Sequence, residues 1–255
     1  MSPDMSPDMS GGVTAGGIRA ALDEVAGIGP FFAASANPAE MVDDSWRPVR
    51  ELYADPEPLA ARIRQVAEAL GQPEPRVAAS IAYQGLAARL VSPVIAAASV
   101  HRLLPQWSPD TLHWRYAAVG PWPLWESGGD DLARRPQPED LAAAVGETLV
   151  EPHLAALADA VRAAVAVSPR TLWGNAASAV VAAGRLVAQA RPAAAGAAWQ
   201  VVAGLLSAGP LAGTGDFPGG WAFRRRSCCL YYRIPGGGLC GDCVLTERPR
   251  RSTIR

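Results

Sequence analysis

The sequence contains no lysine, so all 23 basic residues are arginine. This absence excludes the lysine-containing P-loop that many enzymes use to hold nucleotide phosphates. Two glycine clusters remain, GIGPFF from Gly27 and GTGDFPGG from Gly213. Neither follows a clear strand and opens a helix, as a dinucleotide-binding fingerprint requires. We therefore expect no bound NAD or FAD.

Histidine and net charge are also scarce. The three histidines, His101, His113 and His153, are scattered, and their spacing indicates no Ser-His-Asp set. We expect structural positions for them. The formal net charge of −1 gives no general reason to bind nucleic acid, and we find no basic recognition helix. We expect no nucleic-acid partner.

Long apolar runs are few. The longest, PAAAGAAWQVVAGLLSAGPLAG from Pro192, is alanine-rich, contains Gln200 and is interrupted by Pro210. We predict a buried helix there and no integral membrane segment. Residues 1–12, MSPDMSPDMSGG, lack the basic and apolar regions of a signal peptide and are predicted to be a disordered tail. The expected location is the cytoplasm, either free or peripheral to the inner face of the membrane.

The hydrophobic pattern predicts a mainly α (α+β) fold. Hydrophobic residues make up 49% of the chain, enough for a substantial core. Helical spacing predicts helices over 16–29 and 57–71, and two helices after Pro75 that are separated at Pro93. The segment 139–167 is predicted to be one long helix or two helices broken at Pro152. A further helix is predicted to begin at Ser168 and Pro169, and a last one covers 194–207. The segment 111–127 alternates in places and predicts two short strands.

A glycine- and proline-rich connection divides the chain near Gly213. We predict a mainly helical domain over 13–213, with its short β element near 111–127, and a small C-terminal module over 214–255. About forty residues are too few for an independent core, so a bound metal is expected to hold the module.

All four cysteines, Cys228, Cys229, Cys240 and Cys243, lie within sixteen residues, spaced Cys-Cys-x10-Cys-x2-Cys. Two residues between ligands let both thiolates face one metal centre, and Gly241 is predicted to take a positive φ in that turn. The adjacent pair is different, because neighbouring side chains in an extended segment point to opposite sides. Convergence on one zinc ion would need a local kink.

The spacing favours a [2Fe-2S] cluster, which takes four thiolates and has a larger footprint than one zinc ion. Structural zinc more often uses two Cys-x2–4-Cys pairs, so zinc is the second alternative. Two disulfides are the third, disfavoured in a reducing compartment. The residues alone leave all three open.

The stretch RRRSCCLYYRIPGGGLCGDCVL, from Arg224 to Leu245, resembles the C-terminal signature of the FhuF-like ferric siderophore reductases. LWGNAASAV, from Leu172, resembles the helix that precedes the cluster in that family. The resemblance implies that Cys228, Cys229, Cys240 and Cys243 bind a [2Fe-2S] cluster. It also implies one-electron reduction of a ferric siderophore, releasing iron. The electron would come from an external donor, a ferredoxin or a flavin reductase.

Four arginines surround the cysteines: Arg224, Arg225, Arg226 and Arg233. We expect some of them to dock an anionic siderophore or an acidic electron donor, with a solvated basic edge as the alternative. Trp173 and Asn175 are expected to pack the helices against the module, with Asn175 bonded to the linker backbone. The alternative function is a non-catalytic iron–sulfur sensor or a siderophore-binding accessory protein. A zinc-stapled interaction domain is a third.

Overall fold

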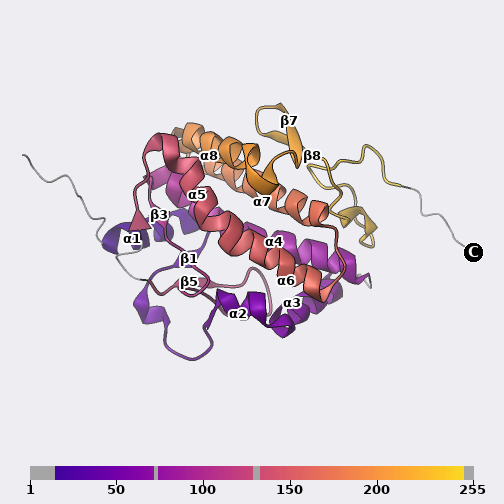
Figure 1. Cartoon of the computed structure of the whole chain (residues 1–255), viewed down its shortest axis with the longest axis horizontal. Coiled ribbons are helices and arrows are strands. Elements are labelled where there is room, and N and C mark those ends of the chain that lie inside the picture. The colour runs from indigo at the N-terminus through magenta and orange to yellow at the C-terminus, as the bar shows by residue number, and fades with distance from the viewer. Residues whose placement is uncertain (1–14, 72–73, 129–132, 250–255) are drawn as a thin grey trace, which may run out of the picture.

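The computed structural model describes residues 15–71, 74–128 and 133–249. The tail predicted over 1–12 and the last six residues of the C-terminal module lie outside these ranges. Helices dominate the described chain and the strands are short, so the predicted mainly α (α+β) class is confirmed. The helices lie side by side, and the C-terminal segment lies at one end of them (Figure 1).

The helix α4, Pro75–His101, runs through the centre of the molecule. It packs against α7 (Pro169–Ala190), α3 (Pro56–Ala69), α1 (Ala15–Ala26) and α8 (Ala195–Ser207). Apolar side chains occupy all sides of α4 rather than one stripe, which is typical of a helix buried on every side. Neighbouring helices can therefore cover it all round.

A single continuous α4 corrects the prediction of two helices separated at Pro93. A proline inside a helix removes one backbone hydrogen bond. Here Val91, Val94 and Ile95 are completely buried around it, and this packing outweighs the lost bond. The Ser92 hydroxyl also donates to the carbonyl of Ala88 at 2.7 Å.

The same helix is the one described helix long and apolar enough to cross a membrane, rather than the run from Pro192. Of its most apolar 18-residue window, 78% is buried inside the protein. A core helix accounts for this burial. The described chain thus shows no clear integral membrane segment.

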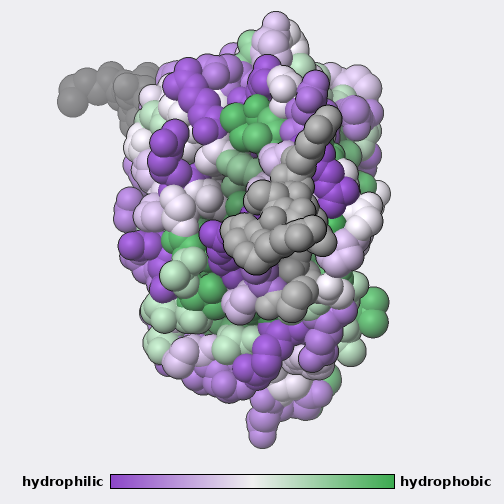
Figure 2. Space-filling view, turned by 90° about the vertical axis from the view of Figure 1, so that its right-hand side faces the viewer, coloured by the Kyte–Doolittle hydropathy of each residue, from purple (hydrophilic) through white to green (hydrophobic). Residues whose placement is uncertain are grey.

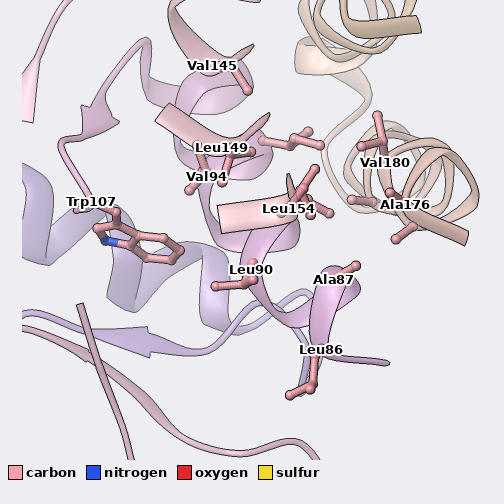
Figure 3. Close-up of a cluster of buried hydrophobic side chains, with 14 of the residues drawn as sticks. Leu86, Ala87, Leu90, Val94, Trp107, Val145, Leu149, Leu154, Ala176 and Val180 are labelled. Atoms are coloured by element: carbon pink, nitrogen blue, oxygen red, sulfur yellow. The ribbon is translucent and has the colours of Figure 1, made fainter. Parts of the chain in front are cut away.

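The segment 139–167, predicted to hold one helix or two, contains two: α5, Leu141–Leu149, and α6, Ala156–Ala164. A wider π-helical turn over Val150–Ala155, which contains Pro152, joins them. Figure 3 shows the resulting core, where Val145, Leu149 and Leu154 lie close to α4. Leu90 and Val94 of α4 face these three side chains, and Ala176 and Val180 approach from α7.

Most helix starts follow from local sequence. Helix α3 begins at Pro56, and the Asp55 side chain caps it by accepting from the Glu57 amide at 3.0 Å. It ends before Gly71, whose φ of +56° breaks the helix. Helix α7 begins at Pro169 as predicted, but the Ser168 side chain makes no capping hydrogen bond. A short helix, α2 (Val49–Ala54), precedes α3.

The two strands predicted over 111–127 are β4, Leu112–Trp114, and β5, Leu124–Glu126, paired antiparallel. They form a four-stranded sheet, in the order β1-β5-β4-β2, with the two-residue strands β1 (Ala34–Ser35) and β2 (Arg47–Pro48). Strands β3 (Leu104–Pro105) and β6 (Ala133–Arg134) pair separately. The two-residue strands are too short to leave a periodic pattern, so the sequence did not predict them.

The C-terminal segment begins with a hairpin of β7, Gly215–Gly219, and β8, Ala222–Arg225. Trp199 of α8 meets Phe217 and Trp221 edge-on, with ring centroids 5.0 and 5.1 Å apart. Phe223 belongs to the same hydrophobic core as the helices. The hairpin is therefore anchored to α8 by aromatic contacts.

Candidate functional site

Strand β8 directs one arginine inward. Along β8 the burial alternates: Ala222 and Arg224 are exposed, whereas Phe223 and Arg225 are buried. This is the two-residue period of a strand packed on one face. Arg225, only 1% exposed, is the largest of the fully buried side chains.

The guanidinium of Arg225 is held by three hydrogen bonds. It donates to Asn175 Oδ1 at 2.8 Å, to the Gly174 carbonyl at 3.0 Å and to Asp242 Oδ2 at 3.2 Å. A buried guanidinium needs such partners, because burial of an unpaired charge is very unfavourable. The docking role predicted for Arg225 is therefore wrong. Its side chain joins α7 to the cysteine segment.

Asn175 extends this contact to α4. Its amide donates to the Ser80 carbonyl at 2.8 Å and to Ser80 Oγ at 2.9 Å. The Ser80 hydroxyl donates in turn to the carbonyl of Cys229 at 2.8 Å. Asn175 thus bonds α4 and Arg225, rather than the linker backbone as predicted. These buried bonds fix Cys229 against two core helices.

Asp242 fixes the other cysteine pair, Cys240 and Cys243, between which it lies. Its Oδ2 accepts from Arg225 Nε and from the Ser178 hydroxyl of α7. Its carbonyl accepts from the Arg225 amide at 3.0 Å. The first half of the cysteine motif is consequently bonded to α4 and the second half to α7.

Gly174 lets the chain approach α7 just before the adjacent cysteines. A Cβ atom at this position would lie 2.1 Å from the Oγ of Ser227. A side chain at this position would force the Ser227 hydroxyl to turn away from α7. The LWGN sequence therefore supplies both a space for Ser227, from its glycine, and a hydrogen-bond partner for Arg225, from its asparagine.

The four cysteines are free of disulfides. Cys229 is buried, and the other three are partly exposed. The sulfur atoms of Cys229 and Cys240 lie 3.5 Å apart. Two thiolates bound to one tetrahedral metal at ~2.3 Å would be ~3.8 Å apart. These two side chains, one from each half of the motif, thus fit a shared metal.

The backbone turns sharply after each cysteine pair. Leu230 has a φ of +69°, an unfavourable conformation for a non-glycine residue. Its amide donates to Cys228 Sγ at 3.3 Å, and the Leu245 amide donates to Cys243 Sγ at 3.4 Å. Amide donors at the sulfurs stabilise negative charge there. A local kink, which convergence of the adjacent cysteines on one zinc ion was expected to need, thus lies at Leu230.

The positive φ predicted for Gly241 is wrong. It occurs instead at Gly236, with a φ of +70°, inside the turn that joins the two halves. There the Gly237 amide donates to the Ile234 carbonyl at 2.9 Å and folds the chain back. The turn between Cys240 and Cys243 closes with an amide-to-carbonyl bond of 3.2 Å between those two residues.

The thiol pKa values differ. The hydrogen bond between the sulfur atoms of Cys229 and Cys240 lowers the pKa of Cys229 to about 6 and raises the pKa of Cys240. Burial raises the pKa of Cys228. The positive charge of Arg225 lowers the pKa of both Cys228 and Cys229. On Cys228 it opposes the effect of burial, and on Cys229 it adds to the effect of the hydrogen bond. Arg225 thus favours negative charge on the adjacent pair.

Residue geometry alone does not complete a metal site. In the described ranges no three His, Cys, Asp or Glu side chains gather around one metal position. The histidines make separate contacts: His153 with Tyr53 at 2.8 Å, His113 with the Thr111 carbonyl at 3.0 Å and His101 with Glu24 at 3.3 Å. Among the described residues, the four cysteines are therefore the candidate ligands for a metal centre.

Comparison with protein families gives a match in the cysteine segment. Residues 225–245 match the FhuF 2Fe-2S C-terminal domain. The matched FhuF segment contains all four cysteines, so the predicted resemblance is confirmed over this part of the chain. No curated protein matches the chain.

The FhuF match supports an iron–sulfur cluster in this segment. Its cysteines are compatible with such a group, because they are free thiols and two of them are already at the spacing of ligands to one metal. The network around Arg225 spans the match from its first residue to Asp242. The buried contacts therefore join the matched segment to α4 and α7, which lie outside the match.

The other three predicted arginines are at or near the surface. Arg224 is exposed and donates to the Val244 carbonyl at 3.3 Å. Arg226 is exposed and makes two hydrogen bonds with Asp216, at 2.9 and 2.6 Å. Arg233 pairs with Glu74, with Nε 3.1 Å from Oε1. Docking stays a prediction for these three.

Sequence reasoning missed Ser80, Gly174, Ser178 and Asp242. Ser80 and Ser178 lie in helices of small residues, where nothing local distinguishes them from helix-packing serines. Asp242 carried a signal, because an acidic residue between two metal-binding cysteines is electrostatically unfavourable unless a cation offsets it. The buried Arg225 is that cation.

Figure 2 looks at the end of the molecule beside which the C-terminal segment lies. Hydrophobic groups are interspersed there among hydrophilic ones. Three cysteines of the segment are partly exposed, so its thiols are not fully enclosed by the helices.

Proposed function

We propose that the chain is a ferric siderophore reductase of the cytoplasm, either free or peripheral to the inner face of the membrane. The observation that supports this is the match of residues 225–245 to the FhuF 2Fe-2S C-terminal domain, which covers all four cysteines. Cys228, Cys229, Cys240 and Cys243 would hold a [2Fe-2S] cluster. The module over 214–255 would carry the redox centre, and the helices within 13–213 would support it.

When bound, a [2Fe-2S] cluster supplies transfer of one electron at a time. The chain's own residues do the positioning. Ser80 holds the backbone of Cys229, and Ser178 and Arg225 hold Asp242 between Cys240 and Cys243. The amides of Leu230 and Leu245 donate to two of the sulfurs. These donors and the charge of Arg225 favour a reduced, more negative centre.

The substrate would be Fe(III) wrapped in the hard oxygen donors of a siderophore. One electron from an external donor, a ferredoxin or a flavin reductase, converts Fe(III) to Fe(II), and no covalent bond of the siderophore changes. The same oxygens hold the softer, less charged Fe(II) far less tightly, so the iron is released. The step needs proximity and a donor, and it needs no acid or base.

The experiment begins with protein purified without air. We expect a red-brown protein with iron and sulfide in the ratio of a [2Fe-2S] cluster, and an S = 1/2 EPR signal after reduction with dithionite. Serine at Cys229 or Cys240 should abolish that signal. Ser227→Ala, next to the motif, is the matched control and should retain it. A colourless protein with one bound zinc would contradict the proposal and favour a zinc-stapled interaction domain.

The second stage mixes the reduced protein with ferric siderophores and follows both the EPR signal and the Fe(II) released. Reoxidation of the protein with equivalent Fe(II) is the expected result. A cluster that assembles but is oxidised by no ferric siderophore would leave the alternative, a non-catalytic iron–sulfur sensor or siderophore-binding accessory protein.

A further inference from the structure

A cleft of about 240 Å³ opens beside the cysteine segment. Its walls come from the start of α7, from the chain over 210–214 and from the two residues before the cysteines. Arg170, Trp173, Arg226 and Ser227 are among the residues that line it. The cleft therefore lies between the start of α7, the chain that follows α8, and the first residues of the FhuF segment.

The charge of the cleft is positive. Arg170 and Arg226 both line it, and none of the described residues that line it is Asp or Glu. Arg226 donates from Nε and Nη2 to the exposed Asp216, which offsets its charge and leaves Nη1 to face a ligand, so the unpaired positive charge comes mainly from Arg170. Arg170 is exposed at the start of α7. The cleft thus offers guanidinium donors that suit an oxygen-rich anion, which arginine binds through its planar fork.

The rest of the wall is apolar. The indole of Trp173 is half-buried and packs against the hydrophobic core, and prolines 169 and 210 line the cleft with it. An aromatic face beside guanidinium groups suits a flat, charged ring or chelate group. A small inorganic anion would leave this apolar wall unused.

The cleft lies next to the cysteines. Ser227 lines it and is followed by Cys228, whose Cα is ~3.8 Å farther along the chain. Ser227 is also pressed against Gly174 of α7, so this part of the wall is fixed to the helix. Its hydroxyl is buried and bonds to no described residue. A group bound in the cleft would be held close to the adjacent cysteine pair.

We propose that this cleft binds one chelating arm of an anionic ferric siderophore, with Arg170 and Arg226 at its oxygens and Trp173 against its flat face. The inference rests on the proposed function and adds a place for the substrate and two residues, Arg170 and Trp173, that the motif does not contain. Pockets that enclose a drug-sized molecule have ~300–1,000 Å³. At about 240 Å³ the cleft takes an edge of the chelate and leaves the remainder in solvent.

The test measures binding separately from electron transfer. The probe is the gallium complex of a tricatecholate siderophore, since Ga(III) has the charge of Fe(III) and is not reduced. Equilibrium dialysis with the full chain compares wild type, Arg170→Gln, Arg226→Gln and Arg185→Gln. Arg185 is the matched control, because it is exposed on α7, the helix of Arg170, and does not line the cleft.

We expect Arg170→Gln and Arg226→Gln each to weaken binding about 3- to 10-fold, and Arg185→Gln to leave it unchanged. With the ferric complex the same two variants should raise KM and leave the EPR signal of the reduced protein unchanged. A neutral gallium trihydroxamate should show a smaller loss. Equal binding by all four proteins, or no binding by wild type, would contradict the proposal that the cleft binds the siderophore.

The two proposals fail in different ways. Wild-type reduction of the ferric complex with unchanged KM in Arg170→Gln and Arg226→Gln would retain the reductase and overturn the cleft. Tight, arginine-dependent binding of the gallium complex without any reduction of the ferric one would retain the cleft and overturn the reductase.

Discussion

Three consecutive arginines have three different surroundings. Arg224 is exposed, Arg225 is buried among α7 and Asp242, and Arg226 is exposed and paired with Asp216. The alternation of β8 separates them, because adjacent side chains of a strand face opposite sides. One residue type in one short run is therefore internal at one position and exposed at the two beside it.

At the residue scale we predict that Arg225→Met destabilises the protein by about 3 kcal/mol. The change leaves Asp242 and Asn175 buried without the guanidinium, and breaking a buried pair typically costs about 3–5 kcal/mol. Arg224→Met, one residue away and exposed, should change the free energy of unfolding by less than about 0.5 kcal/mol. Urea unfolding followed by circular dichroism measures both. Equal effects of the two substitutions would show that the buried network does not hold the segment.

At the scale of elements, close helix packing depends on particular glycines. Gly204 of α8 faces α5, where a Cβ atom would lie 2.4 Å from the Cβ of Ala142. Gly196, in the same helix, has no atom within 4 Å of its Cβ position. Gly196 lies in the first turn of α8 with open space beside it, whereas Gly204 lies farther along the helix against α5.

We predict opposite effects of alanine at these two positions. Gly204→Ala should lower the free energy of unfolding by about 1–3 kcal/mol, because α5 and α8 must separate. Gly196→Ala should raise it by about 0.5–1 kcal/mol, since alanine favours helix and meets nothing there. Thermal and urea unfolding of both variants test the prediction. Stabilisation by both would mean that α5 and α8 are farther apart than described.

At the scale of the whole molecule, one buried acid makes stability depend on pH. Glu126 of β5 is 2% exposed, and its carboxyl accepts from the indole of Trp107 at 3.1 Å. Burial raises its pKa from an ordinary 4.5 to about 7. The folded chain therefore binds a proton that the unfolded chain releases between these values, and stability falls as pH rises through this range.

We predict that Glu126→Gln removes this loss. At about 1.4 kcal/mol for each pH unit, wild type should lose about 3 kcal/mol relative to the variant between pH 4.5 and 7, and little beyond. His153, whose pKa burial lowers to about 4, titrates in both proteins and cancels from the difference. Urea unfolding across this pH range is the measurement. Glu147→Gln, at an exposed ion pair, should stay parallel to wild type, and parallel curves for Glu126→Gln would contradict the prediction.

Local patterns predicted most of the helices correctly, because amphipathic spacing and terminal proline or glycine depend on nearby residues. The helices α1, α3, α7 and α8 begin and end close to their predicted positions. The prediction failed where burial outweighs local preference. Pro93 does not end α4, because the helix is packed on all sides.

The sequence by itself determined the mainly helical class, the β4–β5 pair and the grouping of the four cysteines, since composition, periodicity and spacing carry that information along the chain. The tertiary structure decided which side chains support the cysteines. Ser80 lies 149 positions from Cys229 along the chain, and their hydrogen bond exists only because α4 packs beside the C-terminal segment. It also decided that Arg225 is internal, because strand alternation fixes the inward face only once β8 has packed on α7.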